Sequence, residues 1–329
     1  MTKHNHIIPI LITPLLVLCL SLILGCSKQS PSSAHRKTVP HQQRWGIYAL
    51  DLVSEDVELL YSSSRKISYL QLNGSADRFA FSMKIDGDED EDEEICTLRT
   101  DGGDFKRLTN NVFWDLYPSL SSDGSQIAFL TWRDITLDIY VMDAVEGGVD
   151  RKLYDSGFHD ADIHWSGDKI AFTRNSQIWM MNHDGTGDQQ VTDPPNAGQP
   201  SNAPYPFGDY DPRLKPDLSQ IVFERLMGDS SPHGNYDIYV INSHGSGETR
   251  LTSSGYTQGL ASWSHMGDKI VYLVAAIDDQ GTYDIYMMNF DGSENHNITP
   301  DDFPANFLCH YPVFSGDDSR VFFVGEWWE

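Results

Sequence analysis

The chain has 329 residues, of which 40% are hydrophobic and 22% charged, and its formal net charge at pH 7 is −25. Phosphate backbones and anionic lipid headgroups attract clusters of Lys and Arg, so neither nucleic acid nor an anionic lipid surface is an expected partner. The length and the hydrophobic fraction suffice for one large folded core.

The first 25 residues have the pattern of a secretory signal peptide. A polar start that carries Lys3 is followed by the apolar run Ile7–Leu24. Residues 23–26 read Ile-Leu-Gly-Cys, which resembles the lipobox of bacterial lipoproteins. The resemblance implies cleavage before Cys26 and acylation of that residue. The alternative is a membrane-spanning helix, for which the length is marginal and Pro9 and Pro14 are unfavourable.

The same resemblance implies an address in the cell envelope. Ser27 stands where an Asp favours inner-membrane retention, so we expect an outer-membrane lipoprotein that faces the periplasm or is exported to the surface. Residues 26–44 are rich in Ser, Gln, Pro, His and Lys, which is typical of a flexible tether. The predicted organisation is a signal peptide over 1–25, a tether over 26–44 and a folded body over 45–329.

The folded body repeats itself with a period near fifty residues, which is typical of propellers and arrays. A polar residue followed by three apolar residues recurs six times, and runs of this kind bounded by Gly, Asp and Ser favour strands. The six copies begin at Arg78, Gln126, Lys169, Gln220, Lys269 and Arg320.

Each copy is flanked by three further strand patterns. An inner strand precedes it, a strand of the Ile-Tyr type follows it, and a short outer strand closes the unit after an Asp-Gly or similar turn. We expect the outer strands near Leu59, Leu108, Leu153, Val191, Leu251 and Ile298. Four antiparallel strands in a meander make one propeller blade.

The two ends of the body complete one blade between them. The C-terminus supplies only two inner strands, which end at Trp327-Trp328, and the N-terminal Trp45–Tyr61 supplies only two outer strands. The predicted fold is therefore all-β: a six-bladed β-propeller of four-stranded antiparallel blades, closed by N- and C-terminal strands that share one blade. Closure protects strand edges that would otherwise aggregate.

The motifs of the repeat resemble those of a known family. Trp-Ser or Leu-Ser, a Gly-Asp-Lys-Ile-Ala-Phe strand at Gly167–Phe172, Asp-Ile-Tyr-Val-Met at Asp138–Met142, Asp-Gly and Leu-Thr resemble the PD40, or WD40-like, repeats of TolB-type propellers over nearly all of 45–329. TolB-type translocation proteins carry a separate α/β domain before the propeller and are usually soluble in the periplasm. We expect this chain to have no room for that domain and to be tethered, so no contact residues are carried over.

Aligning the blades on their second strands places six residues just before the innermost strands, where a propeller narrows toward its axis. They are Ile67, Asp115, Asp160, Asp209, Gln258 and Cys309. Neighbours in the sequence are Trp114, His159, Asp162, Tyr210, Asp211, His310 and Tyr311. Three carboxylates in consecutive blades, with aromatic neighbours, predict a channel-mouth site for a cation or the basic end of a peptide. The alternative is that these Asp side chains bond turn amides.

An acidic segment, Asp86–Glu94, includes Asp86, Asp88, Asp90 and Asp92 as candidate metal ligands. Hard cations prefer oxygen-rich segments, so the candidate cofactor is Ca²⁺, although the spacing does not match an EF-hand. The alternative is a solvated, self-repelling loop. A Ca²⁺-stabilised structural protein follows as a third functional hypothesis.

Two further features allow two interpretations each. The insertion Pro194–Pro206 is either a recognition loop or a spacer over one face. Cys96 and Cys309, in an exported protein, either form a disulfide or are two buried small apolar residues.

The leading hypothesis for function is an envelope-anchored lipoprotein that binds a protein or peptide partner with one propeller face. Gly-x-Ser-x-Gly, His-Glu-x-x-His and a phosphate-cradling loop are absent from the sequence. The alternative is a metal-dependent propeller enzyme, a lyase or hydrolase acting on carbohydrate or peptide. Propeller lyases use channel histidines to hold a metal, and His159, His164 and His310 are the candidates.

Overall fold

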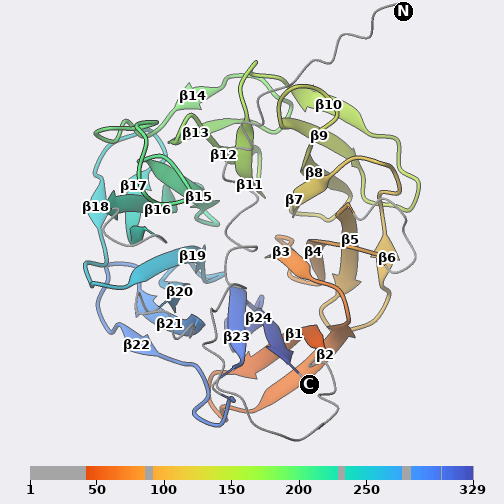
Figure 1. Cartoon of the computed structure of the whole chain (residues 1–329), viewed down its shortest axis with the longest axis vertical. Helices are drawn as coiled ribbons and strands as arrows, with labels where there is room; N and C mark the ends of the chain where they lie inside the picture. Colours follow the sequence, from red (N-terminus) through yellow and green to blue (C-terminus); the bar gives the residue numbers. More distant parts are fainter. Residues whose placement is uncertain (1–41, 86–91, 229–233, 276–282, 305, 329) are drawn as a thin grey trace, which may run out of the picture.

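The computed structural model describes residues 42–85, 92–228, 234–275, 283–304 and 306–328. These residues form six four-stranded antiparallel sheets, arranged as blades around a central axis (Figure 1). The prediction of an all-β, six-bladed propeller is confirmed. No helix within the described ranges has the length and apolar character needed to cross a membrane.

The strands of each blade follow one another from the axis outward. The innermost strands are β3 (Ile67–Leu72), β7 (Asp115–Leu120), β11 (Asp160–Ser166), β15 (Asp209–Leu214), β19 (Thr257–Trp263) and β23 (Leu308–Phe314). The second strands are β4 (Arg78–Met83), β8 (Gln126–Thr131), β12 (Lys169–Arg174), β16 (Gln220–Gly228), β20 (Lys269–Ala275) and β24 (Arg320–Trp328). The third strands are β5 (Glu94–Arg99), β9 (Asp138–Asp143), β13 (Gln177–Asn182), β17 (Asn235–Asn242), β21 (Tyr283–Asn289) and β1 (Gln43–Asp51). The outermost strands are β6 (Lys106–Arg107), β10 (Arg151–Tyr154), β14 (Gln189–Gln190), β18 (Thr249–Arg250), β22 (His296–Asn297) and β2 (Val57–Ser63).

We number the blades 1 to 5 from β3–β6 to β19–β22, and the sixth is the closing blade. In the closing blade β1 pairs with β24 from Gln43↔Trp328 to Asp51↔Arg320, so strands from both ends of the chain lie side by side. The predicted shared blade is confirmed. Its register also places Gln43 and Trp328 at the end of the propeller where the innermost strand β23 begins.

The recurring apolar triplet forms the core. Its third residue is an aromatic side chain on the second strand, at most 2% exposed in every blade: Phe81, Phe129, Phe172, Phe223, Tyr272 and Phe323. Burying one such ring contributes roughly 1.5–3 kcal/mol. Cys96 and Cys309 are free and buried in two different apolar clusters, and burial raises the pKa of both thiols.

The Leu-Thr motif of the repeat is explained by one hydrogen bond. The Thr109 hydroxyl accepts the Ile95 amide at 2.9 Å, which caps the start of the third strand where the outermost strand has ended. Thr192, Thr252 and Thr299 do the same for Ile178, Ile238 and Ile285. In these four blades the outermost strand has two residues and ends before the motif. The sequence predicts these strands at the motif itself, which is slightly too far along the chain.

Candidate binding face at the propeller axis

The alignment of the predicted mouth residues agrees with the strand register. Ile67, Asp115, Asp160 and Asp209 each open an innermost strand and pair with the sixth residue of the second strand. Gln258 and Cys309 occupy the same register position in their blades. We call the end of the propeller where the innermost strands begin the mouth face.

The three aspartates of this set are held by basic side chains of their own blades. Asp160 Oδ1 accepts the Arg174 Nε–H at 3.0 Å, and both Asp209 oxygens accept Arg225 N–H groups at 2.6 and 2.9 Å. Asp115 lies 3.6 Å from Arg133. All three side chains are buried, and burial raises the pKa of Asp115 and Asp160 to about 6 despite their partners. Their carboxylates therefore face protein, and their part in ligand binding stays a prediction.

The histidines named by the sequence have separate surroundings. His159 Nδ1 accepts the Leu137 amide at 3.1 Å, and burial lowers its pKa. His164 Nδ1 accepts the Leu214 amide at 3.0 Å, and burial lowers its pKa to about 3. The His310 ring contacts Glu326 at 3.0 Å and stacks on Trp45. Across the ranges that the structure describes, no group of three or more His, Cys, Asp or Glu side chains is arranged to hold a metal ion.

Only the end of the acidic segment lies within the described residues. Asp86, Asp88 and Asp90 lie outside the described residues, whereas Asp92 is buried. Glu93 accepts the Ser82 hydroxyl at 2.9 Å, and Glu94 accepts an Arg107 N–H at 2.7 Å. The end of the segment is thus tied into blade 1, and a Ca²⁺ site nearer its start stays a prediction.

A ring of six side chains surrounds the axis, two residues beyond the aligned mouth positions. Each lies where the innermost strand shifts register against the second strand, and each has a positive φ between 49° and 58°. The six are Tyr69, Tyr117, Asp162, Asp211, Leu260 and Tyr311. A positive φ is uncommon for such residues and costs energy, so its presence in all six blades marks a built feature of the axis. We call this set the axial ring.

The axial ring has two chemically different sides. Tyr69 stacks on Tyr117 with centroids 3.6 Å apart and lies 5.6 Å from Tyr311, which makes an aromatic side over blade 1, blade 2 and the closing blade. On the other side, in blades 3 and 4, Asp162 Oδ2 lies 3.4 Å from the Asp211 amide nitrogen.

A third carboxylate joins the acidic side from the second strand of blade 4. Glu224 Oε2 accepts the Leu260 amide at 2.9 Å. A Cβ on Gly259 would lie only 2.1 Å from this oxygen, so the glycine permits the contact. The nearest cation is Arg213, whose Nη2 is 3.9 Å from Asp211 Oδ1 while its Nη1 donates to the Pro212 carbonyl.

Burial raises the pKa of all three carboxyl groups, and the charges of neighbouring carboxylates add to the rise for Asp211 and Glu224. Burial raises the pKa of Asp162, and burial together with the charges of Asp162 and Glu224 raises that of Asp211 well above its usual value. Burial raises the pKa of Glu224 to about 7. A group that brings positive charge would be favoured at such a place.

Buried polar atoms close to the acidic side have no hydrogen-bond partner. The Gln71 amide spans from blade 1 to blade 3, donating to the carbonyl of Ile163, the residue after Asp162, at 3.0 Å, but its Oε1 has no hydrogen-bond partner. Asp211 Oδ1 and the Tyr236 hydroxyl also have none. Gln71 is 4% exposed and Tyr236 is 3% exposed. Unsatisfied buried polar atoms are uncommon and often mark functional places.

The Pro-rich insertion borders the same place. Its end packs Ala203, Tyr205 and Phe207 against a cluster formed by Tyr210, Leu226 and Tyr236. Tyr205 lies close enough to the axial ring that its charge would raise the pKa of Tyr117, although burial is the main cause of that shift. The insertion therefore forms part of the mouth face.

Exposed apolar side chains lie on three mouth-face loops around blade 2. The Trp132 ring is 5.3 Å from His159 and its amide donates to the Trp114 carbonyl, so these loops are neighbours. Their exposed members are Val112 (65%), Trp132 (37%), Ile135 (89%) and Phe158 (52%), which we call the apolar patch. Exposed apolar groups that gather in this way often mark protein contacts.

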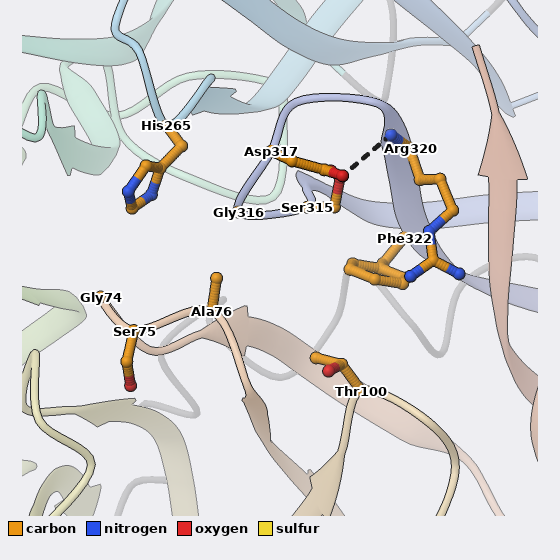
Figure 2. A pocket seen from close by; sticks show the side chains of 10 residues that line it. All are labelled: Gly74, Ser75, Ala76, Thr100, His265, Ser315, Gly316, Asp317, Arg320 and Phe322. Atoms are coloured by element: carbon orange, nitrogen blue, oxygen red, sulfur yellow. Dashed lines mark hydrogen bonds between the residues drawn. The ribbon is translucent and has the colours of Figure 1, made fainter. Parts of the chain in front are cut away.

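A cleft of about 420 Å³ lies at the opposite ends of the innermost strands, between turns of blade 1 and of the closing blade (Figure 2). Its polar groups are bound within the turns: Asp317 accepts the Ser315 and Ser319 hydroxyls, and the Arg320 guanidinium lies over Phe322. The stronger candidate for binding is therefore the mouth face.

The sequence named three members of the axial ring, Asp162, Asp211 and Tyr311, as neighbours of the aligned mouth residues. It missed Tyr69, Tyr117, Leu260 and Glu224. The signal was available, because every ring residue stands two positions after an aligned mouth residue.

Comparison with known proteins supports the fold and little else. No family model matches the chain. An uncharacterized protein of Agrobacterium fabrum is 27% identical over 193 residues, which are 54% of this chain and 61% of that protein's length. A structure described as TolB from Agrobacterium tumefaciens has a TM-score of 0.65 at 15% identity, covering 87% of this chain and 99% of that one. An oligogalacturonate lyase in complex with manganese has a TM-score of 0.52 at 14% identity, covering 85% and 82%. At such identities the likeness shows a shared propeller fold, which has hosted both binding proteins and enzymes.

Proposed function

We propose that this protein is an envelope-anchored lipoprotein that binds a segment of a protein partner with its mouth face. The observation that carries the proposal is that the apolar patch and the axial ring lie at the same end of the propeller. The apolar patch offers apolar surface that a partner would cover, and the axial ring offers polar atoms to which a partner would hydrogen-bond.

The anchoring part of the proposal rests on the sequence of residues 1–44. Cleavage after Gly25 would leave Cys26 as the acylated N-terminus, and residues 26–44 would link it to the propeller. The chain enters β1 at Gln43, on the mouth face, so the linker would join the propeller at the face that binds the partner. Mass spectrometry of the protein isolated from membranes should find lipid on Cys26, and Cys26→Ser should release the protein into the soluble fraction.

The binding part is tested by site-specific photo-cross-linking in intact cells. A photoreactive residue is placed at Phe158 (52% exposed) or Tyr256 (51% exposed), both in loops that lead into innermost strands. Matched controls at Val53 (90% exposed) and Met266 (78% exposed) lie in turns at the opposite end. We expect one discrete cross-linked protein at the two mouth-face positions and none at the controls.

Equal cross-linking at all four positions, or none at Phe158 and Tyr256, would contradict a partner on the mouth face. The lipid and the cross-linking measurements are independent, so either part of the proposal can fail without the other.

A further inference from the structure

We propose that the acidic side of the axial ring binds a guanidinium group, such as the side chain of an arginine in a partner segment. The inference rests on the proposed function, because it names the chemistry by which the mouth face would recognise its partner.

The first step is the local imbalance of charge. Asp162, Asp211 and Glu224 come together from blades 3 and 4, and Arg213 is the cation nearest to them. Arg213 makes only a long contact with the cluster, because its Nη2 is 3.9 Å from Asp211 Oδ1 while its Nη1 donates to the Pro212 carbonyl. A further cation would offset the repulsion among the carboxylates.

The second step is independent of charge. Gln71 Oε1 and Asp211 Oδ1 are acceptors without donors, and Gln71 is 4% exposed at the place where its amide crosses between blades. The Tyr236 hydroxyl, 3% exposed, is a further unpaired polar group beside the cluster. Burying such atoms without partners costs roughly 1–3 kcal/mol each. A ligand with several N–H donors would supply the partners that these acceptors lack.

The third step selects the kind of cation. The acceptors lie on three different strands, Gln71 on β3, Asp211 on β15 and Glu224 on β16. A metal ion needs its ligands in one close shell, which the described residues do not form. A guanidinium carries five N–H donors in a plane, and its faces stack on aromatic rings. The stacked Tyr69 and Tyr117 form the opposite side of the same ring.

The pH dependence of binding follows from the groups that face the cluster. A bound cation favours the ionised carboxylates, so binding releases protons and strengthens as pH rises toward and above the pKa of Glu224, about 7. Among the other groups, burial lowers the pKa of His164 to about 3 and raises those of Tyr117, Tyr210 and Tyr236, so none of these opposes the change. Tyr205 and Arg213 also lie around the cluster.

The experiment is calorimetric titration of the full chain in detergent with small probes. Agmatine, cadaverine and N-carbamoylputrescine each carry one ammonium, and at the other end they present a guanidinium, a second ammonium and an uncharged urea of guanidinium-like shape, respectively. We call N-carbamoylputrescine the urea probe. We expect agmatine to bind at least tenfold more tightly than the urea probe and several-fold more tightly than cadaverine, with binding stronger at pH 8 than at pH 6. Equal affinity for agmatine and the urea probe would overturn the proposal, and equal affinity for cadaverine would overturn the choice of guanidinium.

Variants locate the site. Glu224→Gln and Asp211→Asn should each weaken agmatine binding about tenfold, and Asp217→Asn, in an exposed turn at the opposite end of blade 4, should leave it unchanged. Binding that survives both axial variants would overturn the assignment. The comparison of agmatine with the urea probe needs no variant, so it tests the proposal even if a variant fails to fold.

A further experiment distinguishes an arginine within a peptide from a free guanidinium compound as the ligand. A peptide of the cross-linked partner with its arginine intact should bind more tightly than agmatine, and its citrulline counterpart should not. If cross-linking succeeds but neither guanidinium probe binds, the proposed function stands and this inference fails.

Discussion

Blades 1 and 4 lie on opposite sides of the axis and are built on the same plan, yet they meet the axis with different chemistry (Figure 1). Both have four strands, a register shift in the innermost strand and a residue of positive φ at that shift, Tyr69 in one and Asp211 in the other. The pair that opens the innermost strand is Ile67 with Met83 in blade 1 but Asp209 with Arg225 in blade 4. The repeat thus fixes a scaffold, and the differences that can carry function collect at the mouth-face ends of the inner strands.

The largest effect should be the same in both blades. Phe81 and Phe223 occupy equivalent positions on second strands, and both are 0% exposed. Phe81→Ala and Phe223→Ala should each lower the free energy of unfolding by about 3–5 kcal/mol, because each removes a large buried ring and leaves a cavity. Urea denaturation measures both. A loss of stability in only one variant would show that the equivalent rings of the two blades do not contribute alike to stability.

The ion pair between Asp209 and Arg225 should make blade 4 respond differently from blade 1, which has an apolar pair at this place. Arg225→Met leaves the buried Asp209 carboxylate without its partner, which should cost about 3 kcal/mol. The double variant Asp209→Ile with Arg225→Met copies blade 1 and should recover most of that loss, because an apolar pair needs no charge compensation.

The matched control for this cycle is Asp209→Ile alone. It leaves Arg225 paired with Glu248, a residue 37% exposed at its side chain, so its cost should be smaller than that of Arg225→Met. Additive losses in the double variant would mean that the pair contributes nothing as a pair, contrary to the geometry.

These two comparisons also show what the sequence could predict. The apolar triplet recurs in every blade and the threonine cap in four of them, because blades of one plan need the same core and the same cap, and recurrence is visible in a sequence. The aspartates Asp115, Asp160 and Asp209 were aligned correctly for the same reason. Their arginine partners were not recognised, because Arg174 and Arg225 lie 14 and 16 residues downstream and meet them only across a hairpin.

The axial ring is harder to predict because a bulge sets its direction. One irregular step in the innermost strand turns Tyr117 or Asp162 toward the axis, and simple alternation along the strand does not show it. Glu224 is harder still, since its position corresponds to Ser82 in blade 1, whose hydroxyl donates to Glu93 instead.

Glu224→Gln should change how the stability of the protein depends on pH, because it removes a carboxyl group that only the acidic side of the axis has. Burial raises the pKa of Glu224 from 4.5 to about 7, so the folded state holds this proton more tightly than the unfolded state. The resulting stability is present below pH 4.5 and is lost as pH rises through 7. The variant, which cannot ionise, should therefore exceed the parent in stability at pH 8.5 by about 1–2 kcal/mol and match it near pH 4.5.

Thermal unfolding at both pH values measures this difference. Asp217→Asn serves as the control, because hydrogen bonds from Ser219 lower the pKa of that exposed carboxyl and no gain at pH 8.5 is expected. If the difference in melting temperature between the parent and Glu224→Gln is the same at both pH values, a group other than Glu224 causes the pH dependence.

The smallest effect on stability should come from Gly259→Ala. The new Cβ would lie 2.1 Å from Glu224 Oε2 and 3.1 Å from its Cδ, so the carboxylate must move away from the Leu260 amide. A carboxylate at the end of a flexible side chain moves cheaply, and the cost should be about 1 kcal/mol, the low end for overpacking.

The informative result is the contrast with Gly255→Ala, since a Cβ at Gly255 would have no atom within 4 Å. If Glu224 holds a guanidinium from its present position, Gly259→Ala should weaken agmatine binding several-fold while Gly255→Ala changes neither affinity nor melting temperature. Unchanged affinity in Gly259→Ala would mean that the position of the Glu224 carboxylate against the Leu260 amide is immaterial to the site, and that the acidic side of the axis acts only through its total charge.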